Sequence, residues 1–248
     1  MSVRPARPTA KRARAISAGA AFVVLSVASC ESSVAPPRRQ LVIVVDTDAP
    51  LAVQAERDPS IAPQAAVDTL RVDIFDADGR GLSNYRDFVV ADPADWPVSF
   101  GVPDPADTGA AYGDPALMRI RLFRASSGRR ETLRGEYVLE PDGALAIDRL
   151  VRVALPEEGS QRLGVTLSFD CLGTPASFRG DYTSCVDASR LQAAVTEGIV
   201  DDPPSTSKVG TSPLARSVEC TGAPAGKVCI PGGFAVLGDP EIAGLGDI

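Results

Sequence analysis

The sequence predicts a mainly β protein whose central part is an antiparallel β-sandwich. Over residues 40–170, short apolar runs recur between clusters of Gly, Pro and Asp, and several runs alternate apolar with polar residues. No segment before Asp187 has a long 3.6-residue period, so we do not expect helices to build the core. Hydrophobic residues form 44% and charged residues 23% of the 248 residues, which is ordinary for a folded protein.

Two segments show the strand pattern most clearly. Residues 41–45 are apolar throughout, which predicts a strand buried on both faces. Residues 70–74 alternate between apolar and charged residues, which predicts a half-buried strand. Further along the chain, Ser126-Ser127-Gly128 favours a hairpin turn. In total we expect seven or eight strands, the others falling at 88–90, 98–100, 118–122, 133–139, 147–155 and 162–169.

Composition excludes several functions. The chain has no His, so it has no imidazole for Ser-His-Asp, Cys-His or His-metal chemistry. A net charge of −7 argues against a nucleic-acid partner. We therefore predict no enzyme, no catalytic residue, no metal and no cofactor.

The first thirty residues have the order of a bacterial export signal. Five basic residues precede an uncharged, mostly apolar run at 15–28, which is too short to span about 30 Å of hydrocarbon as a helix. The run ends in Val27-Ala28-Ser29-Cys30, which resembles the bacterial lipobox, where small residues precede a cysteine that receives a lipid. The resemblance implies lipidation of Cys30. The alternative is an ordinary secretory signal with an incidental cysteine.

Lipidation would place the protein in the cell envelope, attached to a membrane through its acyl chains. Residue 31 is Glu, whereas Asp after the cysteine often signals inner-membrane retention in the lipoproteins that this one resembles, so the outer membrane is favoured. Residues 30–39 are polar and Pro-rich and are expected to form a tether.

Four cysteines remain, an even number that predicts disulfides in an exported chain. We favour Cys171–Cys185 and Cys220–Cys229 among three possible connectivities, because each pair closes a short loop rich in Gly, Pro and Ser. A zinc site is the alternative, but the chain has no C-x-x-C spacing and no His.

Charge and local likeness leave two alternatives in the sandwich. Residues 117–152 are rich in arginine, whereas residues 41–116 are strongly acidic. Arg119, Arg121 and Arg152 either form a basic face for an acidic glycan or face acidic neighbours across the sheet. The segment 70–79 resembles immunoglobulin-like or transthyretin-like modules of secreted proteins, which implies an immunoglobulin-like sandwich.

Weaker candidate sites come from carboxylates and aromatic residues. Asp46/Asp48 and Asp76/Asp78 could donate oxygens to calcium, but Asp-x-Asp-Gly more often forms a turn. Three aromatic residues near the long loops favour either a sugar-stacking surface or, for the tryptophan, a core cap; these are Trp96, Tyr85 and Tyr112.

The end of the chain resembles a second family. Residues 230–238 read Ile-Pro-Gly-Gly-Phe-Ala-Val-Leu-Gly, which resembles the opening of formylglycine-generating, or sulfatase-modifying-factor, domains. Leu237 and Asp239 depart from the usual Met and Ser. The resemblance implies an accessory N-terminal region of such an enzyme whose catalytic core is missing from this chain. The alternative is an incidental Pro-Gly-Gly turn.

These observations give two predicted functions, a lipid-anchored envelope protein whose sandwich serves display or binding, and the accessory region just described. The predicted parts are a signal peptide expected to be disordered (1–29), the tether (30–39), the sandwich (40–170), a disulfide loop with a short helix (171–197), a linker (198–219) and an irregular C-terminal part (220–248).

Overall fold

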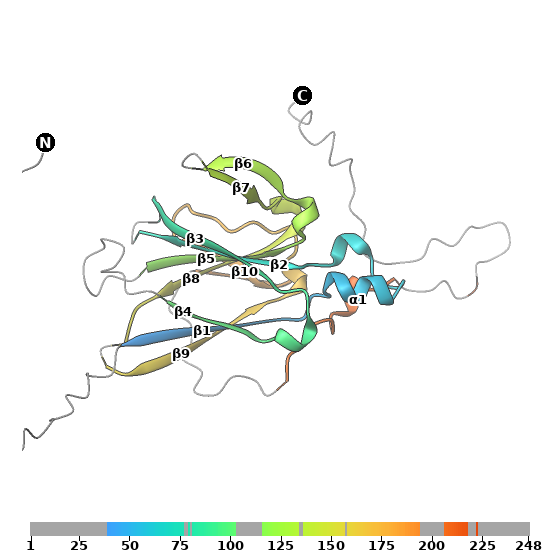
Figure 1. The fold of residues 1–248 in the computed structure, drawn as a ribbon, viewed down its shortest axis with the longest axis horizontal. Coiled ribbons are helices and arrows are strands. Elements are labelled where there is room, and N and C mark those ends of the chain that lie inside the picture. The colour runs from blue at the N-terminus through green and yellow to red at the C-terminus, as the bar shows by residue number, and fades with distance from the viewer. Residues whose placement is uncertain are drawn as a thin grey trace, which may run out of the picture. The chain divides into compact units, whose positions relative to one another are not determined.

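The computed structural model describes residues 39–76, 79, 81–102, 116–133, 136–156, 158–193, 206–217 and 222. Two sheets dominate this part of the chain (Figure 1). The larger sheet has the order β3 (Leu82–Val89), β2 (Thr69–Phe75), β5 (Ala116–Phe123) and β8 (Ala146–Val153), with every neighbouring pair antiparallel. The smaller sheet has the order β4 (Val98–Val102), β1 (Gln40–Thr47) and β9 (Ser160–Leu167).

The prediction of a mainly β fold with antiparallel sheets is confirmed, with one exception. Strand β1 runs antiparallel to β4 but parallel to β9 along its whole length, from Gln40↔Ser160 to Thr47↔Leu167. Strands β1 and β9, the first and last strands of the two sheets along the chain, therefore lie next to each other, and β1 is the middle strand of the smaller sheet. Leu41, Ile43 and Val45 belong to the main core, and on the opposite face of the strand Val44 is buried while Val42 is half-buried.

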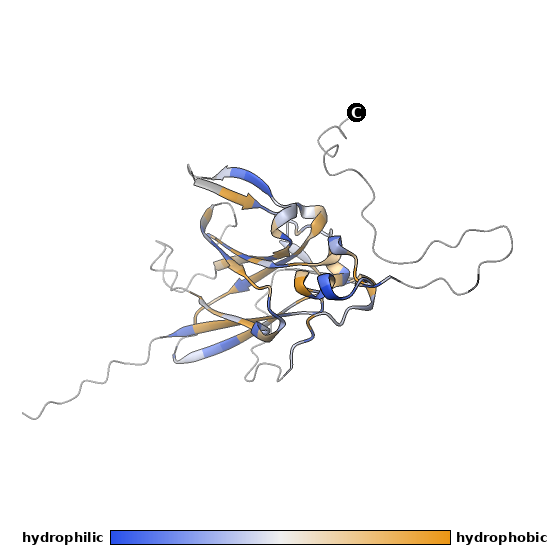
Figure 2. Ribbon diagram, turned by 45° about the vertical axis from the view of Figure 1, so that its right-hand side comes forward, coloured by the Kyte–Doolittle hydropathy of each residue, from blue (hydrophilic) through white to orange (hydrophobic). Residues whose placement is uncertain are grey.

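The main hydrophobic core lies between the two sheets. Strand β1 contributes Leu41, Ile43 and Val45, and strand β5 contributes Met118, Ile120 and Leu122 at alternate positions. Period-2 alternation puts these residues on one face of each strand. Each such side chain stabilises the fold by roughly 1.5–3 kcal/mol through its removal from water. The hydropathy colouring of Figure 2 shows this apolar material concentrated on the strands.

The other face of the larger sheet is also covered. The hairpin of β6 (Arg129–Leu133) and β7 (Glu136–Glu140) lies above it in Figure 1. Elsewhere on that face, Leu117 and Leu150 pack against Phe178 and Tyr182 in a second apolar cluster. This cover explains why β5 and β8 are buried nearly throughout.

The segment after β9 is held by a disulfide and a short two-stranded sheet. Cys171 and Cys185 are bonded, as predicted. The two strands are β10 (Thr183–Asp187) and β11 (Arg190–Ala193). The helix predicted after Asp187 is therefore wrong over the described residues, because the chain turns back to pair with β10. Residues 194–197 lie outside the described residues.

Two further predictions are corrected. The turn at Ser126-Ser127-Gly128 does not join two paired strands, because β5 pairs with β2 and β8 while β6 pairs with β7. The predicted linker is also wrong for 206–217, whose backbone bonds to the two-sheet body. Gly210 N donates to Ala49 O at 2.9 Å, and Ser212 N donates to Asp48 O at 2.9 Å.

Helices are short. The single α-helix of the described residues is α1 (Ala52–Arg57), and Leu51 is its N-cap residue. Six 3₁₀ turns complete the described elements, at Pro63–Ala65, Pro93–Asp95, Ala125–Ser127, Gly143–Leu145, Phe169–Cys171 and Pro213–Ala215.

The turn after β2 depends on one glycine. Gly79 has a φ of +67°, a region that side chains rarely adopt. A Cβ at this position would lie 2.8 Å from Tyr182 Cε1 and 2.9 Å from Leu117 Cδ2. Glycine is thus required here both by the backbone and by the second apolar cluster.

Candidate functional site

A pocket opens between the two sheets at their β3 and β4 edges. Each of these strands is the last in its sheet, and the ring centroids of Phe88 and Phe100 lie 5.7 Å apart in a stacked arrangement. The pocket has a volume of about 510 Å³, which is within the usual size range of small-molecule sites. Its apolar wall consists of Val72, Ile74, Phe88, Phe100, Val102 and Met118.

Strand β3 supplies the polar part of the pocket. Asn84, Arg86 and Phe88 stand opposite Ile74, Val72 and Leu70 of β2. They therefore share the face that looks toward the smaller sheet. The guanidinium of Arg86 lies 5.3 Å from the centre of the Phe88 ring, and Arg86 itself is exposed. A cation thus stands at the mouth of an apolar pocket.

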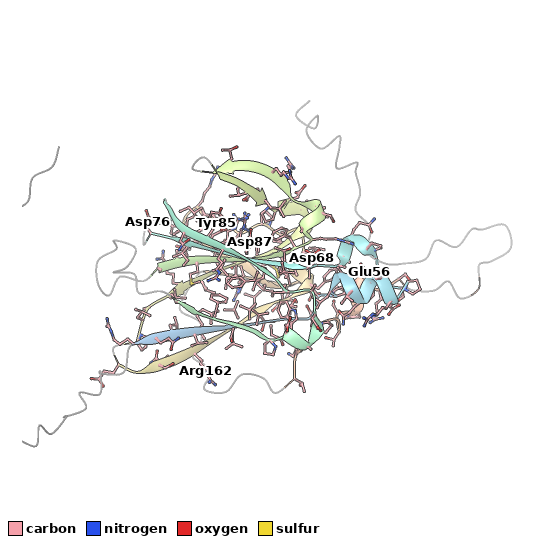
Figure 3. All side chains as sticks on the ribbon, in the orientation of Figure 1. Glu56, Asp68, Asp76, Tyr85, Asp87 and Arg162 are labelled. Atoms are coloured by element: carbon pink, nitrogen blue, oxygen red, sulfur yellow. A yellow bond between two sulfur atoms is a disulfide. The ribbon has the colours of Figure 1, made fainter. Side chains whose placement is uncertain are left out.

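The opposite face of β3 belongs to a buried ion-pair network. Arg71 is 2% exposed and binds both carboxylate oxygens of Asp87, at 2.6 and 2.8 Å. Burial alone would lower the pKa of Arg71, but the hydrogen bond and charge of Asp87 raise that pKa above its ordinary value. Figure 3 labels Tyr85 and Asp87 along this strand. The guanidinium of Arg71 lies 5.2 Å from the centre of the Tyr85 ring.

Arg121 and Glu140 extend the network to the hairpin. Arg121 Nη2 donates to Asp73 Oδ2 at 2.7 Å, and both side chains are 4% exposed. Glu140 of β7 accepts from Arg121 and, at 3.1 Å, from Arg71. Burial raises the pKa of Asp73, an effect that Arg121, Arg119 and Arg71 oppose. Glu140 therefore ties the hairpin to two arginines of the sheet.

Asp148 of strand β8 pairs with Arg119 of the neighbouring strand β5. Arg119 donates to both of its carboxylate oxygens, with the shortest contact 2.5 Å, and Ala176 N donates to Oδ2 at 3.0 Å. The Arg119 guanidinium also lies 5.5 Å from the Phe178 ring centre. Burial alone would lower the pKa of Arg119, but the hydrogen bond and charge of Asp148 raise that pKa above its ordinary value.

These contacts bear on the arginines singled out from the sequence. Arg119 and Arg121 face acidic neighbours across the sheet, as one of the two alternatives predicted. Arg121 is buried rather than outward-facing, because the hairpin covers it. Arg152 lies 5.1 Å from the Tyr182 ring centre. An acidic glycan would have to displace the existing partners of Arg119 and Arg121.

The acidic residues considered for calcium bind the chain itself. Asp46 accepts from Ser207 Oγ at 2.5 Å and from Lys208 N at 3.2 Å. Asp48 accepts from Phe169 N at 2.6 Å, and burial raises its pKa. Within the described residues, no three His, Cys, Asp or Glu side chains gather as a metal site. Asp78 lies outside those residues.

The aromatic candidates separate in space. Trp96 is 6% exposed, belongs to the main core and donates from Nε1 to Val90 O at 3.2 Å. It is thus the core cap that was one of its two predicted roles. Tyr85 is among the residues that line the pocket, although its ring contacts Arg71 on the other face of β3, and Tyr112 lies outside the described residues.

Three other predicted sites lie outside the described residues: Cys30, the pair Cys220 and Cys229, and the segment 230–239. Lipidation and the second disulfide stay predictions, as does the likeness to sulfatase-modifying-factor domains. In the part of the chain that the structure covers, no helix is both long and apolar enough to span a bilayer.

Sequence reasoning did not identify the pocket. The available signal was the alternation in β3, which places Asn84 and Arg86 on the same face as Phe88. Polar residues on the inward face of a strand indicate either an edge strand that is protected against pairing with another chain or a pocket that opens to solvent. The sequence alone does not distinguish the two.

Comparisons of the chain with family models, with curated proteins and with solved structures gave no match.

Proposed function

We propose that this chain is a cell-envelope protein, anchored to a membrane by a lipid on Cys30, whose immunoglobulin-like β-sandwich binds a partner and performs no catalysis. The disulfide Cys171–Cys185 carries the proposal. Disulfides form and persist in oxidising compartments outside the cytoplasm, and both cysteines are buried in the fold. The positive, then apolar, then small-residue order before Cys30 supports the same location.

The binding role is supported by the pocket at the β3 and β4 edges. The wall of this pocket is apolar, and its mouth carries Arg86 and Asn84. The buried carboxylates have a different task, since Asp73 and Asp148 are each paired with an arginine. Those groups hold the sheet and its cover together.

Metabolic labelling with palmitate in the host tests the anchor. We expect the wild-type chain to incorporate label and Cys30→Ala to incorporate none, because the thiol of Cys30 begins the modification. Cys220→Ala is the matched control, since it also removes one cysteine, and it should be labelled like the wild type. Equal labelling of the wild type and Cys30→Ala would refute the proposal.

A further inference from the structure

The pocket between β3 and β4 combines an apolar wall with a single class of charge at its mouth. We infer that it binds an amphipathic anion, a molecule with a hydrocarbon body and one carboxylate or phosphate group. This inference deepens the proposed binding role and rests on it.

The apolar wall of the pocket can bind the hydrocarbon part of such a ligand. Ile74, Phe88 and Phe100 are half-buried, so part of each side chain faces the pocket, while Met118 is buried at its base. A ligand that covers them gains about 0.8 kcal/mol for each methylene group it removes from water. A volume of about 510 Å³ admits an acyl chain or a fused aromatic ring of ordinary ligand size.

The anionic group is matched by Arg86. Among the described residues no carboxylate pairs with Arg86, whose guanidinium rests on the Phe88 ring. Arg71, Arg119 and Arg121 of the same sheet all bind carboxylates. A guanidinium recognises carboxylate or phosphate through two parallel N–H donors. Arg86 therefore has its donors available for the head group of a ligand.

The position of Arg86 also favours a small ligand over an added peptide strand. Its side chain lies on the inward face of an edge strand, beside Asn84. Inward-pointing charges on edge strands discourage strand addition. A compact anion can pair with the charge while its hydrocarbon part enters between the sheets.

Photolabelling of the full chain in host membranes tests this inference. The probes are diazirine-bearing decanoate, its methyl ester, and the corresponding alkyl phosphate. We expect decanoate to label peptides covering 84–88 and 98–102. Arg86→Gln should lower that labelling about twofold to fivefold, the range expected for one exposed charge pair. The methyl ester should label more weakly and should not respond to Arg86→Gln. The phosphate and carboxylate arms show which anion is preferred.

Two variants control the result. Arg162→Gln removes an arginine from β9, which is separated from β4 by β1 and contributes no residue to the pocket lining, and should leave labelling unchanged (Figure 3). Ile74→Phe fills the pocket and should lower labelling by every probe. Oxidised Cys171–Cys185 in each variant reports that the fold is intact.

Labelling of these peptides that is equal in wild type and Arg86→Gln would overturn the inference, as would labelling unaffected by Ile74→Phe. The palmitate experiment has a separate readout. A chain without palmitate that retains Arg86-dependent photolabelling would refute the anchor and leave the pocket assignment standing.

Discussion

Replacing Arg121 by Met should destabilise the protein strongly. The side chains of Arg121 and Asp73 are each 4% exposed, and Arg121 Nη2 lies 2.7 Å from Asp73 Oδ2, so the substitution leaves Asp73 buried without its nearest partner. Loss of one member of a buried pair costs about 3–5 kcal/mol. Glu140 is 33% exposed, so water screens its share and the loss arises mainly at Asp73. The corresponding fall in melting temperature is about 6–20 °C for a domain of this size.

The loss should depend on pH in a defined direction. Burial already holds the pKa of Asp73 above 3.8 in the folded protein, and Arg121 is the strongest influence that lowers it. Without Arg121 the folded pKa rises further, so the folded state favours the protonated form. A raised folded pKa gives stability that is present below the unfolded pKa and is lost as pH rises through the folded pKa. Arg121→Met should therefore be penalised more at about pH 7 than at about pH 5.

Thermal unfolding followed by circular dichroism at the two pH values measures both effects. The matched control is Arg129→Met, because Arg129 is 65% exposed and pairs with Asp142 at 3.3 Å on the surface. An exposed pair contributes about 0–1 kcal/mol. If Arg121→Met lowers the melting temperature no more than Arg129→Met does, the network does not have the structural role described here.

Three further outcomes are expected. Replacing Cys171 and Cys185 together by Ala should cost about 3 kcal/mol in denaturant titration, from the entropy of the loop that the bond closes; an unchanged midpoint would refute this. Gly79→Ala and Gly159→Ala both place Ala at positive φ, which costs about 1–2 kcal/mol. A Cβ at Gly79 also meets neighbouring atoms closer than 3 Å, whereas a Cβ at Gly159 meets nothing within 4 Å. Gly79→Ala should thus unfold at lower denaturant than Gly159→Ala, and equal midpoints would contradict the packing given for that turn. Trp96, the only tryptophan of the chain, should show blue-shifted emission that iodide does not quench until unfolding; quenching in the native state would place it outside the core.

Strand positions could be predicted from the sequence because the two-residue period is a local property. Leu70 and Val72 were expected on a buried face and lie there. The outer face of the same strand was expected to meet solvent, but Arg71 and Asp73 are 2% and 3% exposed. Their cover comes from β7, more than sixty residues away along the chain. No local pattern contains that information.

Strand pairing and backbone docking were harder to predict for the same reason. The turn after β5 gives no sign that its neighbours are β2 and β8. Residues 206–217 have the composition of a linker, yet main-chain hydrogen bonds and Asp46 hold them to the body. Backbone groups bond irrespective of side-chain composition, so a polar segment can dock without an apolar pattern. By contrast, the pairing of Cys171 with Cys185 was predictable from loop length.

The intact mass of the protein isolated from its host membrane shows whether Cys30 is the first residue and whether it carries a lipid. We expect a chain that begins at Cys30, bears added acyl groups and contains the Cys171–Cys185 bond. A mass that includes residues 1–29, with an unmodified thiol at Cys30, would contradict it.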